Sequence, residues 1–157
     1  MKKYELTDET IEVYGTALHR IKALKDFGNV KKGELGGYVE SERNLSQEGN
    51  CWVYSNARVY SNARVYGNAW VYGNAEVYDN AEVCGNADYI TIKGLGSKYR
   101  NTTIFRTKEN IAVKCGCFYG TLAEFVDKVK ETHGNSKFAK EYLALIDLVK
   151  IHFELEE

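Results

Sequence analysis

A six-residue repeat occupies the middle of this 157-residue sequence and limits the fold more than any other feature. From residue 51 the chain reads CWVYSN, ARVYSN, ARVYGN, AWVYGN, AEVYDN and AEVCGN. Three residue types recur at six-residue intervals, over the ranges Asn44 to Asn86, Val53 to Val83 and Ala57 to Ala87. Internal periods of this kind are typical of architectures in which each repeat packs on its neighbours.

Each repeat unit predicts a short strand and a corner. In the stretch Ala-x-Val-Tyr the side chains alternate between two faces, so Ala and Val point to one side while x and Tyr point to the other. Small Ala and β-branched Val suit a narrow interior, which places x and Tyr outside. The following Gly-Asn, Ser-Asn or Asp-Asn pair tolerates the left-handed backbone region that a corner uses. Parallel stacking of such strands would satisfy their backbone groups.

The Val-Tyr-Gly-Asn-Ala-x unit resembles the hexapeptide repeat of left-handed parallel β-helices, in which three hexads complete an 18-residue triangular coil. The resemblance implies nine hexads, or about three coils, over residues 35–88. The chain as a whole resembles small hexapeptide-repeat proteins of phages and prophages. This likeness rests on LHRIKALKDFGNVKKGELGGYVESERNLSQEGN before the repeat and TTIFRTKENIAVKCGCFYGTLAEF after it. It covers nearly the full length but carries over no function residue by residue. The resemblance to left-handed β-helix proteins implies a homotrimer.

The complete prediction is a mainly β fold in three parts. These are an N-terminal β cap over residues 1–34, a left-handed parallel β-helix of about three coils over residues 35–92, and a β-hairpin with two α-helices over residues 93–157. The hairpin is expected at residues 102–106 and 111–115. Thr121 and Glu124 form a capping-box pattern that starts the first helix. The second helix, from about residue 136 to 153, is apolar on more than one side, which predicts cover by its own chain and by a partner subunit.

Residues 18 apart are expected to stack on the outer face of the coils. The pairs are Tyr54 with Tyr72, Tyr60 with Tyr78, Trp52 with Trp70, Arg58 with Glu76 and Arg64 with Glu82. The tyrosines are either exterior strand residues stacked in rows or a contact surface, since a row of exposed aromatic side chains is unfavourable unless it is covered. The candidate contact surface, which partner subunits could cover, comprises Trp52, Tyr54, Tyr60, Tyr66, Trp70, Tyr72 and Tyr78.

Charge and composition exclude several classes of function. The net charge of −1 provides no general attraction to nucleic acid or to a membrane surface. No apolar run approaches the ~20 residues of a membrane span, and the polar start Met1-Lys2-Lys3 is unlike a signal peptide. Without a secretion signal, the four cysteines are expected to stay reduced. We therefore expect a protein of the cytoplasm of a bacterial host, with no membrane or nucleic-acid partner and no cofactor.

The sequence offers little catalytic machinery. Acyl transfer generally needs a positioned base, usually a histidine, and the chain has only His19, His133 and His152. A structural role at a helix end is the simpler account of His133. The motif Cys115-Gly116-Cys117 supplies two metal ligands where structural zinc needs four, so we predict buried structural cysteines and no metal. We therefore predict that the protein is not an enzyme, with a hexapeptide-repeat acyltransferase that uses His133 as the alternative.

A basic stretch after the repeat is the main candidate for ligand binding. Its candidate residues are Lys98, Arg100, Thr102, Thr103, Arg106 and Lys108. Such residues could hold phosphate groups, or they could form the solvated face of a hairpin. We favour a non-enzymatic phage accessory protein that counters host defence by sequestering a small anionic, nucleotide-like ligand between subunits. A protein–protein inhibitor or scaffold that binds a host defence protein through the tyrosine rows is an alternative.

Overall fold

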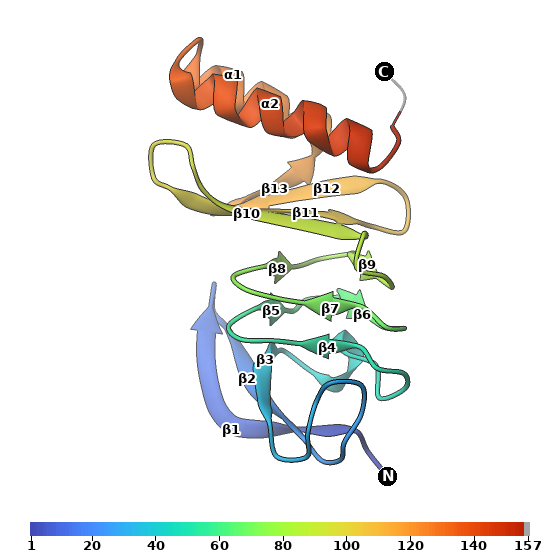
Figure 1. Cartoon of the computed structure of the whole chain (residues 1–157). Helices are drawn as coiled ribbons and strands as arrows, with labels where there is room; N and C mark the ends of the chain where they lie inside the picture. The colour runs from blue at the N-terminus through green and yellow to red at the C-terminus, as the bar shows by residue number, and fades with distance from the viewer. Residues whose placement is uncertain (156–157) are drawn as a thin grey trace.

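The computed structural model describes residues 1–155. Figure 1 shows a molecule layered along one axis, with the N-terminal hairpin and the short repeat strands at one end. An antiparallel sheet follows, and two helices lie on its far side.

The N-terminal segment forms a hairpin that joins the repeat. Strand β1 (Tyr4–Val13) pairs antiparallel with β2 (Thr16–Ala23), which pairs antiparallel with β3 (Leu35–Val39). Strand β3 then pairs in parallel with β5 (Arg58–Val59), which pairs in parallel with β8 (Glu76–Val77). The result is one mixed five-stranded sheet in the order β1-β2-β3-β5-β8.

The other repeat strands form two small parallel sheets. Strand β4 (Trp52–Val53) pairs with β7 (Trp70–Val71), and β6 (Arg64–Val65) pairs with β9 (Glu82–Val83). The predicted pairing of residues 18 apart is therefore confirmed at Trp52 with Trp70, Arg58 with Glu76 and Arg64 with Glu82. The predicted left-handed corners are confirmed too, since Ser55, Ser61 and Asp79 have φ of +56°, +62° and +54°.

The inward positions of the repeat build the main core. Every Val of the repeat from Val53 to Val83 and every Ala from Ala57 to Ala81 is buried, as predicted. Gly36 brings β3 close to this core, because a Cβ there would lie 2.5 Å from the carbonyl oxygen of Val53 and 2.8 Å from the Trp52 ring. Glycine is therefore required where the N-terminal segment meets the first repeat strand.

The predicted fold class, a left-handed parallel β-helix of about three coils, is wrong. The parallel ladders are two residues wide and belong to three separate sheets, one of them mixed, and the longer strands pair antiparallel with one another. The physical reason is that a hexad contributes only two ladder residues before the chain turns. The larger sheets are therefore built mainly from long strands, whose sequences show no six-residue period.

The first turn of the repeat also differs from the predicted frame. Val39 pairs with Val59 and Leu45 with Val65, so the first partners are 20 residues apart where later partners are 18 apart. The two extra residues lie between Leu45 and Val53, which are eight residues apart, whereas Val53 and Val59 are six apart. This segment contains a loop, so the additional residues are accommodated there.

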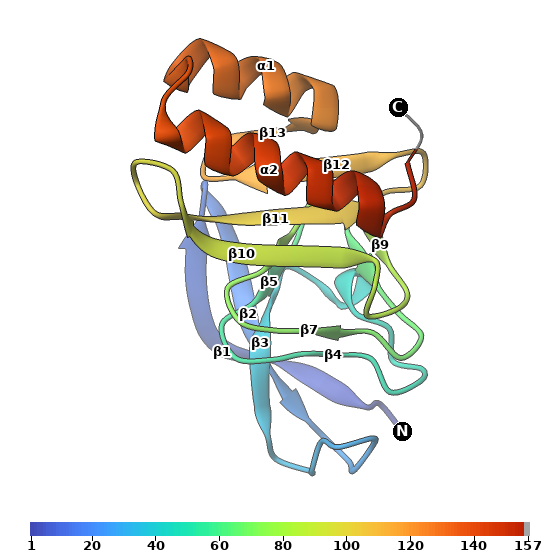
Figure 2. The same ribbon diagram turned by 45° about the horizontal axis from the view of Figure 1, so that its top comes forward.

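The C-terminal part contains a four-stranded antiparallel sheet. Its strands are β10 (Tyr89–Leu95), β11 (Arg100–Arg106), β12 (Ile111–Cys115) and β13 (Phe118–Thr121). The expected hairpin is confirmed as β11 and β12, and β10 and β13 extend it on both edges. Helices α1 (Leu122–His133) and α2 (Lys137–His152) cover one face of this sheet, as Figure 2 shows, and the opposite face packs on the repeat.

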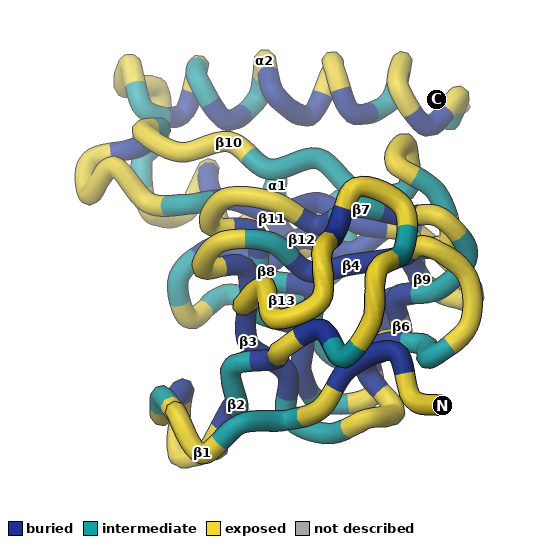
Figure 3. Tube along the Cα trace, turned by 60° about the horizontal axis from the view of Figure 1, so that its bottom comes forward, coloured by how far each residue is buried: buried dark blue, intermediate teal, exposed yellow. Residues whose placement is uncertain are grey.

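Helix α2 buries one side and exposes the other. Figure 3 shows buried and exposed segments alternating along it. The buried side packs on the sheet and α1 through residues such as Tyr142, Leu145 and Val149. Leu148 and Ile151 are 53% and 76% exposed, so cover by a partner subunit stays a prediction. Within residues 1–155, no helix combines the length and the apolar character needed to cross a membrane.

Candidate functional site

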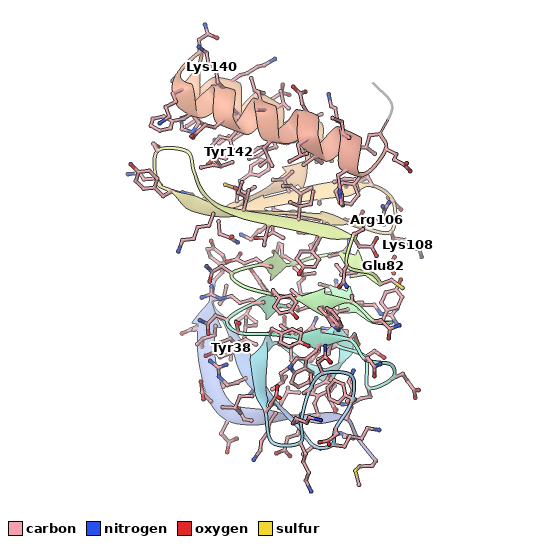
Figure 4. All side chains as sticks on the ribbon, viewed as in Figure 1. Tyr38, Glu82, Arg106, Lys108, Lys140 and Tyr142 are labelled. Carbon is pink, nitrogen blue, oxygen red and sulfur yellow. The ribbon has the colours of Figure 1, made fainter. Side chains whose placement is uncertain are left out.

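The basic candidate residues do not form one cluster. Arg100 and Arg106 are at opposite ends of β11, about 20 Å apart at the usual rise of an extended strand. Lys98 lies in the turn between β10 and β11, beside Arg100. Figure 4 shows Arg106 and Lys108 together at the other end of the sheet. The structure therefore separates the predicted site into two basic groups.

The two threonines between these groups are buried. Thr102 Oγ1 donates to Cys115 Sγ at 3.3 Å, on the face toward the helices. Thr103 Oγ1 accepts from the backbone N–H of Glu76 at 3.0 Å, on the face toward the repeat. Both hydroxyls already have partners inside the fold, so a ligand role for Thr102 and Thr103 stays a prediction that would require these contacts to break.

Lys98 and Arg100 border a cavity of about 360 Å³, here named the helix-side cavity. It lies between the β10–β11 turn, the β12–β13 turn and the helix pair, and its volume falls in the ~300–1,000 Å³ range of small-molecule sites. Its cations are Lys98, Arg100 and Lys128, its aromatic walls are Phe118 and Phe125, and it also includes His133, Tyr142, Cys115 and Cys117. A positively charged rim thus surrounds an apolar interior.

Two glycines allow the polar side chains to reach this cavity. Gly96, at φ +80°, leaves space for the phenol of Tyr142, and a Cβ there would overlap the hydroxyl. Gly116, at φ +58°, leaves space for the guanidinium of Arg100 in the same way. Figure 4 shows Tyr142 between α2 and the sheet. Its hydroxyl donates to the carbonyl of Leu95 at 3.2 Å. Burial, followed by the nearby Cys115, raises the pKa of Tyr142 above its ordinary value.

His133 differs from the other two histidines. His19 Nδ1 lies 3.0 Å from the carbonyl oxygen of Thr7, and His152 Nε2 lies 2.8 Å from that of Ala87. Among residues 1–155, neither ring nitrogen of His133 makes a hydrogen bond. Its half-buried ring stacks on Tyr142, with centroids 5.9 Å apart and planes 26° apart. Packing thus orients the ring while both nitrogens stay available to a bound molecule.

The cysteines contribute no metal centre in the described part of the chain. All four are free thiols there, and no group of three or more potential His, Cys, Asp or Glu ligands comes together. Cys115 is buried, as predicted, but Cys117 is exposed, so the prediction of burial is wrong for it. The alternation of β12 directs Cys115 toward the helices, while Cys117 follows in the turn.

The predicted tyrosine surface is partly covered by the chain itself. Trp52, expected outside, is fully buried against Tyr4 and Phe27, with ring centroids 6.1 Å and 5.2 Å away. Tyr60 is buried under the β1–β2 hairpin, and the others are partly or fully exposed: Tyr54, Tyr66, Trp70, Tyr72 and Tyr78. Tyr54 and Tyr72 stack face to face at 4.3 Å, as the 18-residue offset predicts. A contact role for the exposed members stays a prediction.

Comparison with known proteins adds one point of similarity. No protein-family model matches the sequence. A protein of Escherichia coli (strain K12), named uncharacterized acetyltransferase YdcK, is 40% identical over 62 residues. The relative is named as an enzyme. The match covers 34% of this chain and only 19% of the relative's length. This relative's name contradicts the prediction that the chain is not an enzyme.

Sequence reasoning missed several residues of the helix-side cavity. Lys128 and Phe125 come from α1, and Tyr142 comes from α2. The spacing of Phe125, Lys128 and Val129 on α1 indicates one helix face, but spacing alone does not distinguish the wall of a cavity from the core. The capping box at Thr121 and Glu124 could place the helix, but nothing in the sequence shows that its last turn meets the β10–β11 turn.

Proposed function

We propose that the helix-side cavity is an acyl-transfer site, which moves an acetyl-type group from a thioester donor to an amine or hydroxyl acceptor. The observation that carries the proposal is the position of His133, with both ring nitrogens unbonded within the described chain, on a cavity rimmed by three cations. The name of the E. coli relative supports the same class of reaction.

His133 would act as the general base. Its ring nitrogen takes the proton from the acceptor as the acceptor's N or O attacks the thioester carbonyl, and the proton then passes to the departing thiolate. A histidine suits this step because its ordinary pKa lies near neutral pH. Tyr142 does not suit it, since its raised pKa keeps the hydroxyl protonated.

The three cations would hold the donor's carrier. A donor such as acetyl-CoA has several phosphates, which Arg100 can hold with paired hydrogen bonds and Lys98 and Lys128 with point charges. A cavity of about 360 Å³ has room for the acyl group and part of the carrier arm against Phe118 and Phe125. The phosphates would remain at the rim, where all three cations are exposed.

The test measures release of free thiol from acetyl-CoA in the presence of a panel of small amines and alcohols. We expect turnover in the wild-type chain and a loss of about 100-fold or more in kcat for His133→Ala, the usual contribution of a general base. Arg100→Gln should raise KM for acetyl-CoA with a smaller effect on kcat. Lys140→Gln, on the outer side of α2, is the matched control and should behave like wild type.

Two results would count against this function. Equal turnover in His133→Ala and wild type would remove the proposed base. Binding of acetyl-CoA without thiol release for any acceptor would contradict transfer and would favour the predicted capture of an anionic, nucleotide-like ligand. A homotrimer and a phage origin depend on the sequence resemblance alone and, like a cytoplasmic location, stay predictions.

A further inference from the structure

A second cavity, of about 460 Å³, lies on the other face of the antiparallel sheet. Four separate segments line it: the tip of the β1–β2 hairpin, residues 40–43, the repeat, and the β12–β13 region. We name it the tyrosine cavity, because its lining includes Tyr14, Tyr60, Tyr78, Tyr119, Lys114 and Arg43. It is separate from the proposed acyl-transfer site, although Cys117 borders both.

Lys114 is a buried cation on the wall of this cavity. The alternation of β12 directs Val113 and Cys115 toward the helices and Lys114 toward the repeat. Its side chain is 4% exposed, and its ammonium lies 4.6 Å from the ring of Tyr14 and 5.5 Å from that of Tyr78. A lysine is buried in this way only when other groups stabilise its charge.

The hydrogen bonds of Lys114 are incomplete. An ammonium has three N–H donors, and among residues 1–155 that of Lys114 donates only to the carbonyl of Gly116. The nearest carboxylate oxygen, on Glu76, is 3.8 Å away, which is an ion-pair contact but too long for a hydrogen bond. Burial lowers the pKa of Lys114, and Glu76 opposes this shift. The ammonium thus retains donors for another acceptor.

The other deeply buried lysine provides a contrast. Lys3 is 1% exposed, and its ammonium contacts the carbonyl oxygens of Gly49 and Cys51 at 3.4 Å and 2.8 Å, and Cys51 Sγ at 3.4 Å. All three of its donors therefore have partners, which is typical of a structural lysine. Lys3 lines none of the cavities described, whereas Lys114 combines unused donors with an adjoining cavity.

The charge balance of the tyrosine cavity favours an anion. Glu76 already faces Arg58 at 3.6 Å in addition to Lys114. Glu40 accepts a hydrogen bond from the backbone N–H of Ser61 at 2.9 Å. Arg43 is exposed and makes no side-chain hydrogen bond or ion pair within the described residues. The cavity thus has two cations available and carboxylates that already have partners.

The aromatic walls favour a planar molecule. Tyr78 is central, with its ring centroid 4.8 Å from that of Tyr60 and 5.2 Å from that of Tyr119. Tyr14 closes one side, where its hydroxyl donates to the carbonyl of Gly116 at 3.0 Å. Figure 2 shows the β1–β2 hairpin reaching the antiparallel sheet at this point. Flat rings of a ligand can stack on such walls.

We propose that the tyrosine cavity binds a planar aromatic molecule of mononucleotide size that has an anionic group. The anionic group contacts Lys114 and Arg43, and the aromatic ring packs on Tyr78 and its neighbours. The volume of about 460 Å³ accommodates a molecule of this size.

Calorimetry with AMP, adenosine and inorganic phosphate tests this proposal, since each of the last two probes lacks one half of the expected ligand. We expect AMP to bind and each partial probe to bind at least tenfold more weakly. Arg43→Gln and Lys114→Met should each weaken AMP binding about tenfold, as expected for loss of a charge-assisted hydrogen bond. Arg43 is exposed, so its variant should fold normally even if Lys114→Met does not.

Acetyl-CoA also contains an adenine nucleotide, so AMP could bind the helix-side cavity instead. Arg100→Gln separates the two sites, and we expect it to leave AMP binding unchanged. The proposal is overturned if AMP gives no heat at about 1 mM, if Arg43→Gln binds AMP as wild type does, or if Arg100→Gln alone weakens binding. Failure of acyl transfer would leave this site unaffected.

Discussion

At the scale of single residues, Asp88 connects the end of the repeat to the antiparallel sheet. Its Oδ2 accepts from the backbone N–H groups of Cys84 and Gly85, both at 2.9 Å. Its Oδ1 accepts from Nε of Arg106 at 3.1 Å. Burial alone would raise the pKa of Asp88, but the two backbone hydrogen bonds and Arg106 outweigh it and lower the pKa below its ordinary value.

We predict that Asp88→Asn lowers the free energy of unfolding by about 1–2 kcal/mol at pH 7, because the charge-assisted hydrogen bonds are lost. A lowered folded pKa contributes stability above the unfolded pKa of about 4, which is lost as pH falls through the folded value. The difference in the free energy of unfolding between wild type and variant, measured with urea, should therefore become smaller below pH 4. Asp127→Asn, exposed on α1, is the control. A difference in the free energy of unfolding that stays constant with pH would contradict this account.

The repeat made some residue positions predictable and others not. The buried Val and Ala positions and the left-handed corners follow from the local sequence, because alternation and corner chemistry act within six residues. The burial of Trp52 and Tyr60 does not, because their cover comes from Tyr4 and Phe27 and from the β1–β2 hairpin. The N-terminal segments that cover Trp52 and Tyr60 lie outside the repeat, so its period does not indicate which residues they cover.

At the scale of elements, the start of α1 is the clearest local signal. Thr121 Oγ1 accepts from the backbone N–H of Glu124 at 3.2 Å, and Glu124 Oε1 accepts from the backbone N–H of Thr121 at 2.9 Å. The backbone of Thr121 is the main cause of a lowered pKa for Glu124. This reciprocal arrangement positions the helix that supplies His133 and Lys128.

We predict that Thr121→Ala lowers the free energy of unfolding by about 1 kcal/mol, the usual effect of removing an N-cap side chain. Chemical denaturation followed by circular dichroism measures it. Thr132→Ala, in the last turn of the same helix, should keep or raise stability, because alanine is the better helix former there. An equal decrease in the free energy of unfolding in both variants would mean that the effect of Thr121→Ala is not due to the lost cap.

The antiparallel sheet was predictable only as one hairpin. Strands β11 and β12 are apolar runs on either side of a turn, which is a local signal. The edge strand β10 contains Lys93 and Gly94, and the edge strand β13 contains Gly120. Neither sequence therefore has a pattern that clearly predicts a strand. The burial of Lys114 within β12 was equally hidden, since the sequence does not show that layers cover both faces of this sheet.

At the scale of the whole molecule, α2 presents two exposed apolar side chains on its outer side. Leu148 is 53% exposed and Ile151 is 76% exposed. We predict a homotrimer, from the resemblance to trimeric repeat proteins, so native mass spectrometry should find three times the chain mass of 17.8 kDa. Ile151→Glu should shift the protein toward monomer, with Lys140→Gln as the control. A monomeric wild-type chain at micromolar concentration would contradict the prediction.

Long-range connectivity is the part of the fold that the sequence did not reveal. Pairing at an offset of 18 residues was predictable, but the union of β3 with both the hairpin and the repeat was not. Nor was the meeting of four segments around Lys114. Both cavities form between segments distant along the chain, and their lining residues come together only through packing of whole layers.

The parallel pairing of the repeat restricts how its gene can change length. Because Val53 pairs with Val71 and Val59 with Val77, gaining or losing 18 codons keeps Val opposite Val and adds or removes one turn of the repeat. A change of six codons would move all later residues to a different side of the turn and would displace the antiparallel sheet relative to the hairpin. Natural length variants of this protein should therefore differ in steps of 18 residues, with small exceptions in the loop between Leu45 and Val53.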